Sequence, residues 1–501
     1  MKRLYAGLSV LLLFCALPAA AQDLASFEKR VHVRTLPNGL TVLLLQRPEA
    51  PVFSFFTIVD AGDAQDPTGK TGLAHMMEHM AFKGTENIGT TNYAAEKLAL
   101  DKVEVAYAAY DQENNRRVDR DEKKVAELKA AWEQARKDAD EYVVKNEFGE
   151  IIERNGGVGL NASTGDDSTQ YFYSLPANRL ELWAYLESER FLHPVMREFY
   201  KERDVVMEER RMRTDSSSTG RLVEQFLSVA YDSSPYHRPS IGYASDLRHF
   251  SATDAANFFK TYYVPSNMIV AVVGDLDPDT LFPVIERYFG RIPSGPKPEE
   301  YISTQTPQIS ERTVLLHDPS QPFYIEGYQK PDYRDKDDAV YSVISSVMSE
   351  GRTSRLYRSL VRDQKVAVAA AGFAGFPGDK YRNLYAFYAV PAQGHTAAEM
   401  AAAIHEQIDK LKRDGVSADE LKMVKTRSKA SLLRSLANNQ GLAINLAENQ
   451  LKYGDWRELF RRIDKIDAVT SDDVKRVAGS TFVDTNRTVG VMETQSAKGA
   501  K

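Results

Sequence analysis

Hydrophobic positions form two kinds of pattern along this chain. Residues 31–46 hold two β-rich runs on either side of Pro37-Asn38-Gly39, which predicts a β-hairpin, and the mostly apolar run 52–59 predicts a buried strand. Between Leu100 and Tyr142, apolar residues recur at steps of three and four on both sides of a charged stretch. This spacing predicts an antiparallel helical hairpin with a coiled-coil-like seam.

One helix-then-strand unit occurs twice. Ser251-Ala252-Thr253-Asp254, a helical stretch and a β-rich run from Asn267 are matched by Thr470-Ser471-Asp472-Asp473, a helical stretch and a run from Asn486, each 219 residues later. A capping Ser or Thr precedes both helices. The second half also opens on strand signals, at 314–316 and 323–328. We therefore expect an α/β (α+β) fold with two homologous halves of mixed sheet and helices enclosing a cavity, and the helical hairpin as an insertion in the first half.

The N-terminus has the layout of a cleavable signal peptide. Lys2 and Arg3 precede an apolar run from Leu8 to Leu17, and the small residues 19–21 follow. Cys15, the only cysteine, lies inside this segment, so the exported chain would hold no thiol and no disulfide. No later stretch approaches the roughly 20 apolar residues of a membrane span. We expect a periplasmic protein, with full secretion as the alternative.

The expected domains follow from these features together with the Pro-, Gly- and Glu-rich linker after Ile292. They are a signal peptide (1–21), an N-terminal domain (22–291, with the insertion at about 100–156), a linker (292–306), a C-terminal homologous domain (307–495) and a tail (496–501).

Composition narrows the class of partner. The formal net charge of −6 becomes −8 when the two cations of the signal peptide are removed. This mild acidic excess argues against general nucleic-acid binding.

The chemistry begins at His75-Met76-Met77-Glu78-His79, which lies in a helical pattern. Histidines four residues apart share a helix face, so both imidazoles can reach one metal ion, and Glu78 lies close enough to act on a water molecule beside that ion. A hydrolytic zinc site usually has three protein ligands. Glu202 and Glu209 share one face of a later predicted helix, but spacing alone does not choose between Glu208 and Glu209 as the third.

The segment His75 to Thr85 resembles the signature of the pitrilysin family of inverted zinc peptidases (inverzincins), which includes insulin-degrading enzyme and the mitochondrial processing peptidase. The resemblance implies that His75, His79 and Glu209 bind one Zn²⁺ per chain, that Glu78 is the catalytic base, and that Glu202 is a supporting carboxylate. It places Asn161 and Ala162 on an edge strand that binds peptide substrate. The long gap from His79 to Glu209 departs from the family and is explained by the insertion.

The implied function is a zinc metalloendopeptidase acting on peptides or unfolded polypeptides. The alternative is a non-catalytic scaffold or peptide-binding subunit of a larger assembly. The second half has no His-x-x-Glu-His around Ser345 to Glu350, so one half carries the chemistry.

Active family members often carry an Arg and a Tyr, seven residues apart, in the second half. Here those positions align with Val361 and Val368, while Arg362 is one residue out of register. We therefore expect a homologous partner subunit that lacks zinc ligands and supplies the Arg and Tyr, as in a bacterial two-subunit peptidase.

Overall fold

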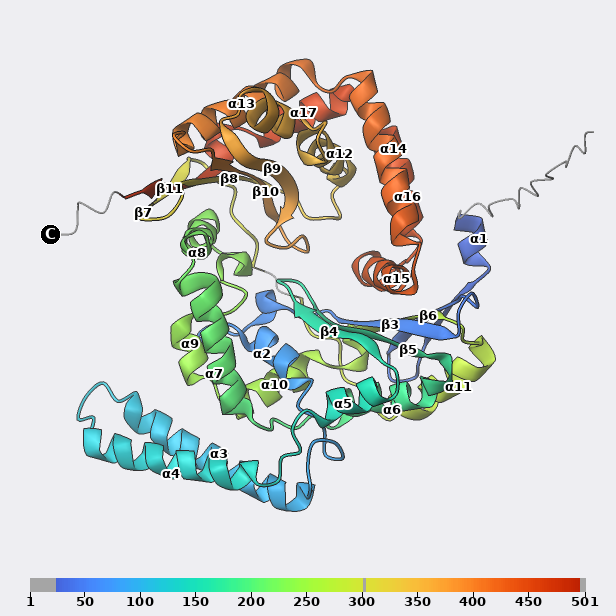
Figure 1. Cartoon of the computed structure of the whole chain (residues 1–501), viewed down its shortest axis with the longest axis vertical. Helices are drawn as coiled ribbons and strands as arrows, with labels where there is room; N and C mark the ends of the chain where they lie inside the picture. The colour runs from blue at the N-terminus through green and yellow to red at the C-terminus, as the bar shows by residue number, and fades with distance from the viewer. Residues whose placement is uncertain (1–23, 301–302, 496–501) are drawn as a thin grey trace, which may run out of the picture.

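The computed structural model describes residues 24–300 and 303–495. The expected signal peptide, its Cys15 and the tail at 496–501 lie outside the described residues. Two mixed β-sheets, each with its own helices, face each other across a central space (Figure 1). The strands of the first sheet are β1 (Val31–Thr35), β2 (Thr41–Gln46), β3 (Val52–Val59), β4 (Val158–Thr164), β5 (Thr169–Pro176) and β6 (Met268–Gly274). Those of the second are β7 (Arg312–Asp318), β8 (Phe323–Lys330), β9 (Ala367–Phe376), β10 (Asn383–Pro391) and β11 (Arg487–Thr494).

Seventeen α-helices complete the described part of the chain. Before the second sheet come α1 (Leu24–Glu28), α2 (Leu73–Met80), α3 (Tyr93–Asn114), α4 (Glu122–Asp140), α5 (Glu147–Arg154), α6 (Leu180–Leu192), α7 (Phe199–Arg210), α8 (Ser218–Ala230), α9 (Ala244–His249), α10 (Ala252–Tyr262) and α11 (Pro278–Phe289). After it begins come α12 (Asp338–Ser349), α13 (Ala397–Asp414), α14 (Ala418–Ser435), α15 (Asn439–Tyr453), α16 (Glu458–Ala468) and α17 (Ser471–Thr481). Two π-helical turns are η3 (Arg211–Asp215) and η6 (Tyr357–Asp363).

The two sheets have the same topology, which confirms the two-halves prediction. The order is β1-β2-β6-β3-β5-β4 in the first and β7-β11-β8-β10-β9 in the second. Strand β6 is parallel to β2 and antiparallel to β3, and β11 is likewise parallel to β7 and antiparallel to β8. Strand β1, paired with β2 as the predicted hairpin, is the addition in the first half.

The repeated unit agrees in its hydrogen bonds as well. Ser251 and Thr470 each form a capping box with the aspartate three residues later, at the start of α10 and α17. The amide groups of Asn267 and Asn486 each donate to the backbone carbonyl five residues earlier and to one carbonyl of a neighbouring segment. The same residues at the same spacing therefore make the same turn into the strand that follows.

Each half packs one helix on the other half's sheet. Helix α8 packs on β7 and β11, while α15 packs on β3 and β6. The ring of Phe226 on α8 lies over Gly327 and Gly490, where an added Cβ would come within 3.0 and 3.2 Å of ring carbons. On the other side, Leu446 and Ala443 of α15 are fully buried against the first sheet. Each exchanged helix thus shares a hydrophobic cluster with the sheet of the other half, and the two clusters join the halves.

The predicted helical hairpin is confirmed as α3 and α4, which project from the first half (Figure 1). Its seam is buried at Val103, Tyr107 and Trp132, and the rings of Tyr107 and Trp132 contact Tyr200 on α7. The seam continues onto α7, so the insertion is packed against the body of the first half.

A buried ion pair anchors the start of the hairpin. Arg197 donates twice to the carboxylate of Glu96, at 2.5 and 2.8 Å, and to the carbonyls of Lys83, Thr85 and Ile88. Both side chains are almost fully buried, with exposures of 1% and 0%. One guanidinium thus fixes α3, the loop after α2 and the segment before α7.

We predict that Arg197→Met destabilises the protein strongly, because it leaves Glu96 as a buried charge without its cation. Losing one partner of such a pair costs about 3–5 kcal/mol. The free energy of unfolding in urea measures the change. The control is Lys97→Met, which removes an exposed pair with Asp101 and should stay within about 0.5 kcal/mol. Equal effects of the two variants would contradict the prediction.

Candidate metal centre

Helix α2 carries the histidine motif and begins at a fixed point. Its N-cap, Gly72, has a left-handed φ of +93°, and the buried carboxylate of Asp66 accepts hydrogen bonds from the N–H groups of Gly72 and Ala74 at 2.6 and 2.9 Å. A Cβ at residue 72 would lie 2.8 Å from the Ile241 carbonyl oxygen. Glycine is therefore required here. The apolar residues of α2 are buried, which turns the more accessible polar side chains of the motif away from the core.

The structure brings His75, His79 and Glu209 together. Oε2 of Glu209 lies 3.7 Å from Nε2 of His75 and 3.5 Å from Nε2 of His79. One ligand atom from each residue lies within 4.8 Å of the others, a separation that a single ion can bridge. Glu208, the alternative left open by spacing, is exposed and pairs with Arg211.

The two imidazoles differ in their protonation, and that of His75 suits a metal ligand. Burial, helped by His79 and Arg213, lowers the pKa of His75 to about 3, so this ring is neutral at pH 7, as metal binding requires. Burial acts in the same direction on His79, but the hydrogen bond with Glu202 and the nearby carboxylates outweigh it and raise the pKa of that ring. Two imidazoles and one carboxylate are a donor set that fits zinc.

Glu78 lies beside this group and faces the same cavity. Burial raises the pKa of its carboxyl, although Thr164 and His79 oppose the shift. Its Oε2 is buried and has no hydrogen-bond partner among the described residues. A carboxylate with a raised pKa and an unoccupied oxygen is suited to accept and release a proton.

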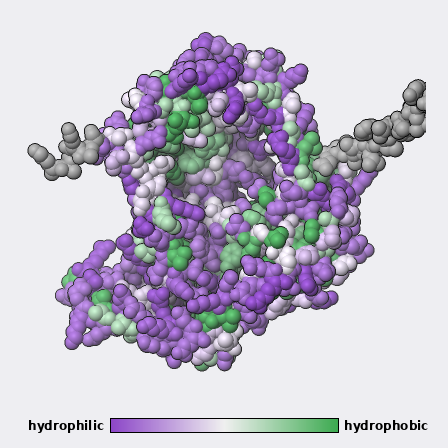
Figure 2. Space-filling model, viewed as in Figure 1, coloured by the Kyte–Doolittle hydropathy of each residue, from purple (hydrophilic) through white to green (hydrophobic). Residues whose placement is uncertain are grey.

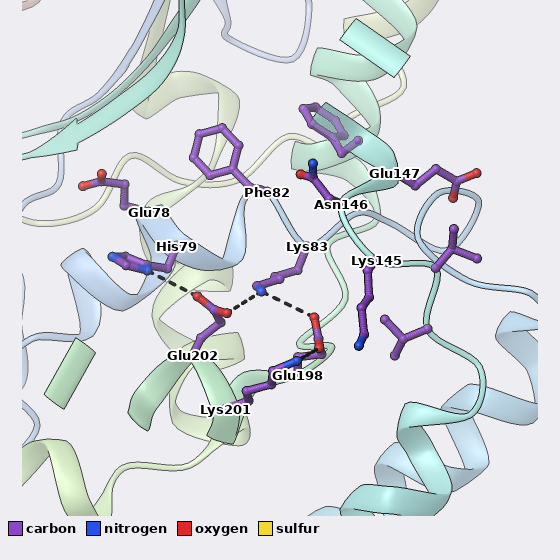
Figure 3. Close-up of a pocket in the computed structure, with 13 residues that line it drawn as sticks. Glu78, His79, Phe82, Lys83, Lys145, Asn146, Glu147, Glu198, Lys201 and Glu202 are labelled. Carbon is purple, nitrogen blue, oxygen red and sulfur yellow. Dashed lines mark hydrogen bonds and ion pairs between the residues drawn. The ribbon is translucent and has the colours of Figure 1, made fainter. Parts of the chain in front are cut away.

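A chain of alternating charges leads away from His79 (Figure 3). Oε2 of Glu202 lies 3.4 Å from Nδ1 of His79, and Lys83 forms ion pairs with both Glu202 and Glu198. Glu198 also accepts from Lys201 at 2.5 Å. The hydrogen bonds from His79 and Lys83 lower the pKa of Glu202 against the effect of burial, so it is ionised. The ionised carboxylate of Glu202 favours a proton on Nδ1 of His79. The other ring nitrogen, Nε2, faces Glu209.

Two of these residues, Lys83 and Glu198, were missed by sequence reasoning. Lys83 follows His79 by four residues, a helical spacing that could have suggested it. Glu198 has a left-handed φ of +57°, a conformation that costs a non-glycine residue about 1–3 kcal/mol and that its two lysine partners help to hold.

The candidate centre opens into a cavity of about 970 Å³. It is lined by Asn161 and Ala162 of β4, by Arg213 and the first turn of α8, and by Phe376 and Pro377 of the second half. Figure 2 shows the molecule hollowed between its halves, with hydrophobic surface inside the recess. Within the described part of the chain β4 pairs only with β5, so its other backbone edge is open. The predicted enclosed cavity and the predicted edge strand thus adjoin the histidine motif.

The carboxyl groups of Asp63, Asp66 and Asp166 are buried together near the start of α2. Burial raises the pKa of Asp66 and Asp166 to about 7, and burial together with these two neighbours raises the pKa of Asp63 well above its usual range. Asp166 also lines the cavity. The cluster takes up protons on folding near neutral pH.

Two family models match the chain. The model described as Insulinase (Peptidase family M16) covers residues 41–114, and the model described as Peptidase M16 inactive domain covers residues 249–428. The chain belongs to this family of pitrilysin-like zinc proteases, which confirms the resemblance seen at residues 75–85.

Individual relatives agree. The chain is 28% identical over 497 residues to the zinc protease PqqE of Helicobacter pylori, covering 97% of each chain. It is 23% identical to a probable mitochondrial-processing peptidase subunit beta of Arabidopsis thaliana, covering 90% of this chain and 76% of that one.

Among solved structures, a protease from Helicobacter pylori superposes with a TM-score of 0.77 at 26% identity, covering 93% of this chain and 99% of the other. The periplasmic protease PqqL from Escherichia coli has the same fold over 48% of its length, with a TM-score of 0.68 at 17% identity and 93% of this chain covered. None of the described helices is long and apolar enough to cross a membrane.

We predict that Asp166→Asn makes stability less dependent on pH. The pKa of Asp166 rises from 3.8 to about 7 on folding, so its contribution to stability is present below about pH 4 and is lost as the pH rises through 7. Residue 166 of the variant cannot ionise. From pH 5 to pH 8 the free energy of unfolding of the variant should therefore rise by about 1–3 kcal/mol relative to that of the wild type. Urea unfolding at both pH values measures this. Asp472→Asn, at a carboxylate with 93% exposure, is the control, and an identical pH profile for Asp166→Asn and wild type would refute the prediction.

Proposed function

We propose that this chain is a zinc metalloendopeptidase that hydrolyses peptides or unfolded polypeptides. The observation that carries the proposal is the arrangement of α2 and α7. Two imidazoles from one helix and the Glu209 carboxylate from the other lie within reach of one ion, and Glu78 faces the same cavity. In this proposal His75, His79 and Glu209 hold one Zn²⁺ per chain.

Zinc, when bound, supplies the Lewis acidity that polarises the scissile carbonyl. The carboxylate of Glu78 takes a proton from the attacking water and delivers it to the leaving amine, for which its raised pKa is suited. Glu202 accepts a hydrogen bond at Nδ1 of His79 and fixes the tautomer and orientation of that ring. Lys83 neutralises Glu202 on its far side.

The substrate would bind as an added strand on β4. Asn161 and Ala162 lie on the edge strand of the first sheet, beside Glu78 and His79 in one cavity. Backbone pairing selects an extended chain more than a particular sequence. This mode favours peptides and unfolded polypeptides over folded proteins.

We further propose that a homologous subunit completes the site. Val361 is partly buried against the hydrophobic cluster of the second half, and Val368 is 59% exposed on the edge strand β9. Because both residues are valines, neither position offers a polar side chain to the site. Arg362 pairs with its neighbour Asp363. A partner that lacks zinc ligands would supply the Arg and Tyr. The proposed compartment is the periplasm, supported by the sequence pattern at 1–21, with secretion as the alternative.

We predict that Glu78→Gln abolishes hydrolysis of an unfolded-peptide pool and leaves zinc bound. The glutamine amide cannot take a proton from water, and residue 78 is not one of the three proposed zinc ligands. Glu209→Gln should lose both zinc and activity. Glu208→Gln changes the adjacent residue and should retain both, since Glu208 pairs with Arg211 at the surface. Zinc per chain and product release are measured together. Stoichiometric peptide binding without turnover in zinc-loaded wild type would favour the peptide-binding alternative.

We predict that the isolated chain cleaves the pool at least tenfold more slowly than the chain mixed with a homologous subunit that lacks the zinc ligands. The Glu78→Gln chain with the same subunit is the control for cleavage by the partner itself. Sedimentation of the mixture should detect a complex. Full activity of the isolated monomer would rule out the need for a partner.

A further inference from the structure

We propose that Arg213 is a positioning residue that orients Glu209, and that the second half of the chain acts on the metal centre through it. This inference rests on the proposed zinc site. It assigns a role to a residue that sequence reasoning did not single out, and it gives the half without the histidine motif a physical connection to the chemistry.

The two oxygens of Glu209 have different partners. Oε2 faces both imidazoles, whereas Oε1 forms an ion pair with Nη1 of Arg213 at 2.7 Å. Because Oε1 is engaged, the carboxylate is held with Oε2 toward the position that a metal would take.

A π-helical turn places Arg213 at this point. Helix α7 ends at Arg210 and η3 follows, with the N–H of Ser216 donating to the Arg211 carbonyl at 2.8 Å, five residues back. On this wider turn Arg213 lines the cavity, as do residues of β4. Turns of this kind are frequent at functional sites.

The first turn of α8 packs directly against the backbone of η3. A Cβ at Gly220 would lie 2.2 Å from the Arg213 carbonyl oxygen and 2.9 Å from Cα of Thr214, so only glycine permits this approach. Arg221 of the same turn donates to the Asp215 carbonyl at 2.5 Å. The backbone of Arg213 is therefore located by α8.

The second half fixes that turn of α8. Asp318, the last residue of β7, accepts from the hydroxyl of Ser218 at 2.6 Å and forms an ion pair with Arg221. Its side chain is only 11% exposed. An acidic group at a helix N-terminus is also favoured by the helix dipole. Contacts run from Asp318 through α8 and η3 to Arg213 and Glu209.

Orientation should outweigh repulsion between Arg213 and the metal. The Arg213 side chain is 72% exposed, so water screens its charge at a distance, while its ion pair with Glu209 is a direct contact. Removing the side chain should therefore weaken zinc binding. Simple relief of repulsion would strengthen it, so the sign of the change separates the two effects.

The test measures the zinc dissociation constant by competition with a chromophoric chelator. Arg213→Met should weaken binding by about 10- to 100-fold, the range typical for groups that hold a metal ligand. Arg213→Lys keeps a charged donor and should recover part of the loss. The control is Arg211→Met, two residues away on the same turn, which loses the exposed pair with Glu208 and a 3.5 Å hydrogen bond to the Ser216 hydroxyl but no contact with Glu209, and should bind zinc as wild type does. Unchanged or tighter binding by Arg213→Met would overturn the proposal.

A double-mutant cycle tests the link to the second half. Asp318→Ala should weaken zinc binding in the wild-type background and have little further effect when combined with Arg213→Met, because both act through Glu209. Additive losses would refute the link, as would a normal zinc affinity in Asp318→Ala. Thermal unfolding without zinc identifies any variant that fails to fold, and the Co²⁺ absorption spectrum reports ligand geometry independently of turnover. If wild type binds zinc but cleaves no peptide, the peptidase proposal fails and the Arg213 comparison still stands.

Discussion

The reciprocal packing of α8 and α15 is the constraint on which the rest of the structure depends. Each half leaves one face of its sheet to be covered by a helix from the other half, and the covering residues are buried on both sides. A helix with an apolar face must bury it, and here α8 and α15 bury theirs on the sheet of the other half. Helix α8 lines the cavity at the candidate centre, so this wall is fixed by the same packing that holds the protein together.

The fold was largely predictable because its signals are local. The capping residues Ser251 and Thr470 and the asparagines after them specify one turn twice, and period-3.6 and period-2 patterns gave the hairpin and the strands. The exchange of α8 and α15 was not predictable in this way. Amphipathic spacing identifies the apolar face of a helix but carries no information about which sheet it will cover.

The candidate site was predictable in part for a related reason. His75, Glu78 and His79 stand in one helix at a spacing that chemistry requires, while the choice of Glu209 over Glu208 needed the family resemblance and agrees with the geometry. Glu198 and Arg213 lie in charge-rich runs that read as solvated surface, and Lys83 lies beyond the end of α2. Their relevance arises only when α2, α7 and η3 are brought together, which is tertiary information.

The helical insertion lies between α2 and α7, the two helices that carry the candidate ligands. It less than doubles the chain length from His79 to Glu209. Closure entropy grows only with the logarithm of loop length, at about 0.6 kcal/mol per doubling, so the longer connection barely hinders the meeting of the two helices in an unfolded chain. The free-energy cost of the insertion lies instead in ordering it against the rest of the first half, and the buried ion pair between Arg197 and Glu96 fixes its base. Loops of quite different length at this point are therefore compatible with the same metal centre.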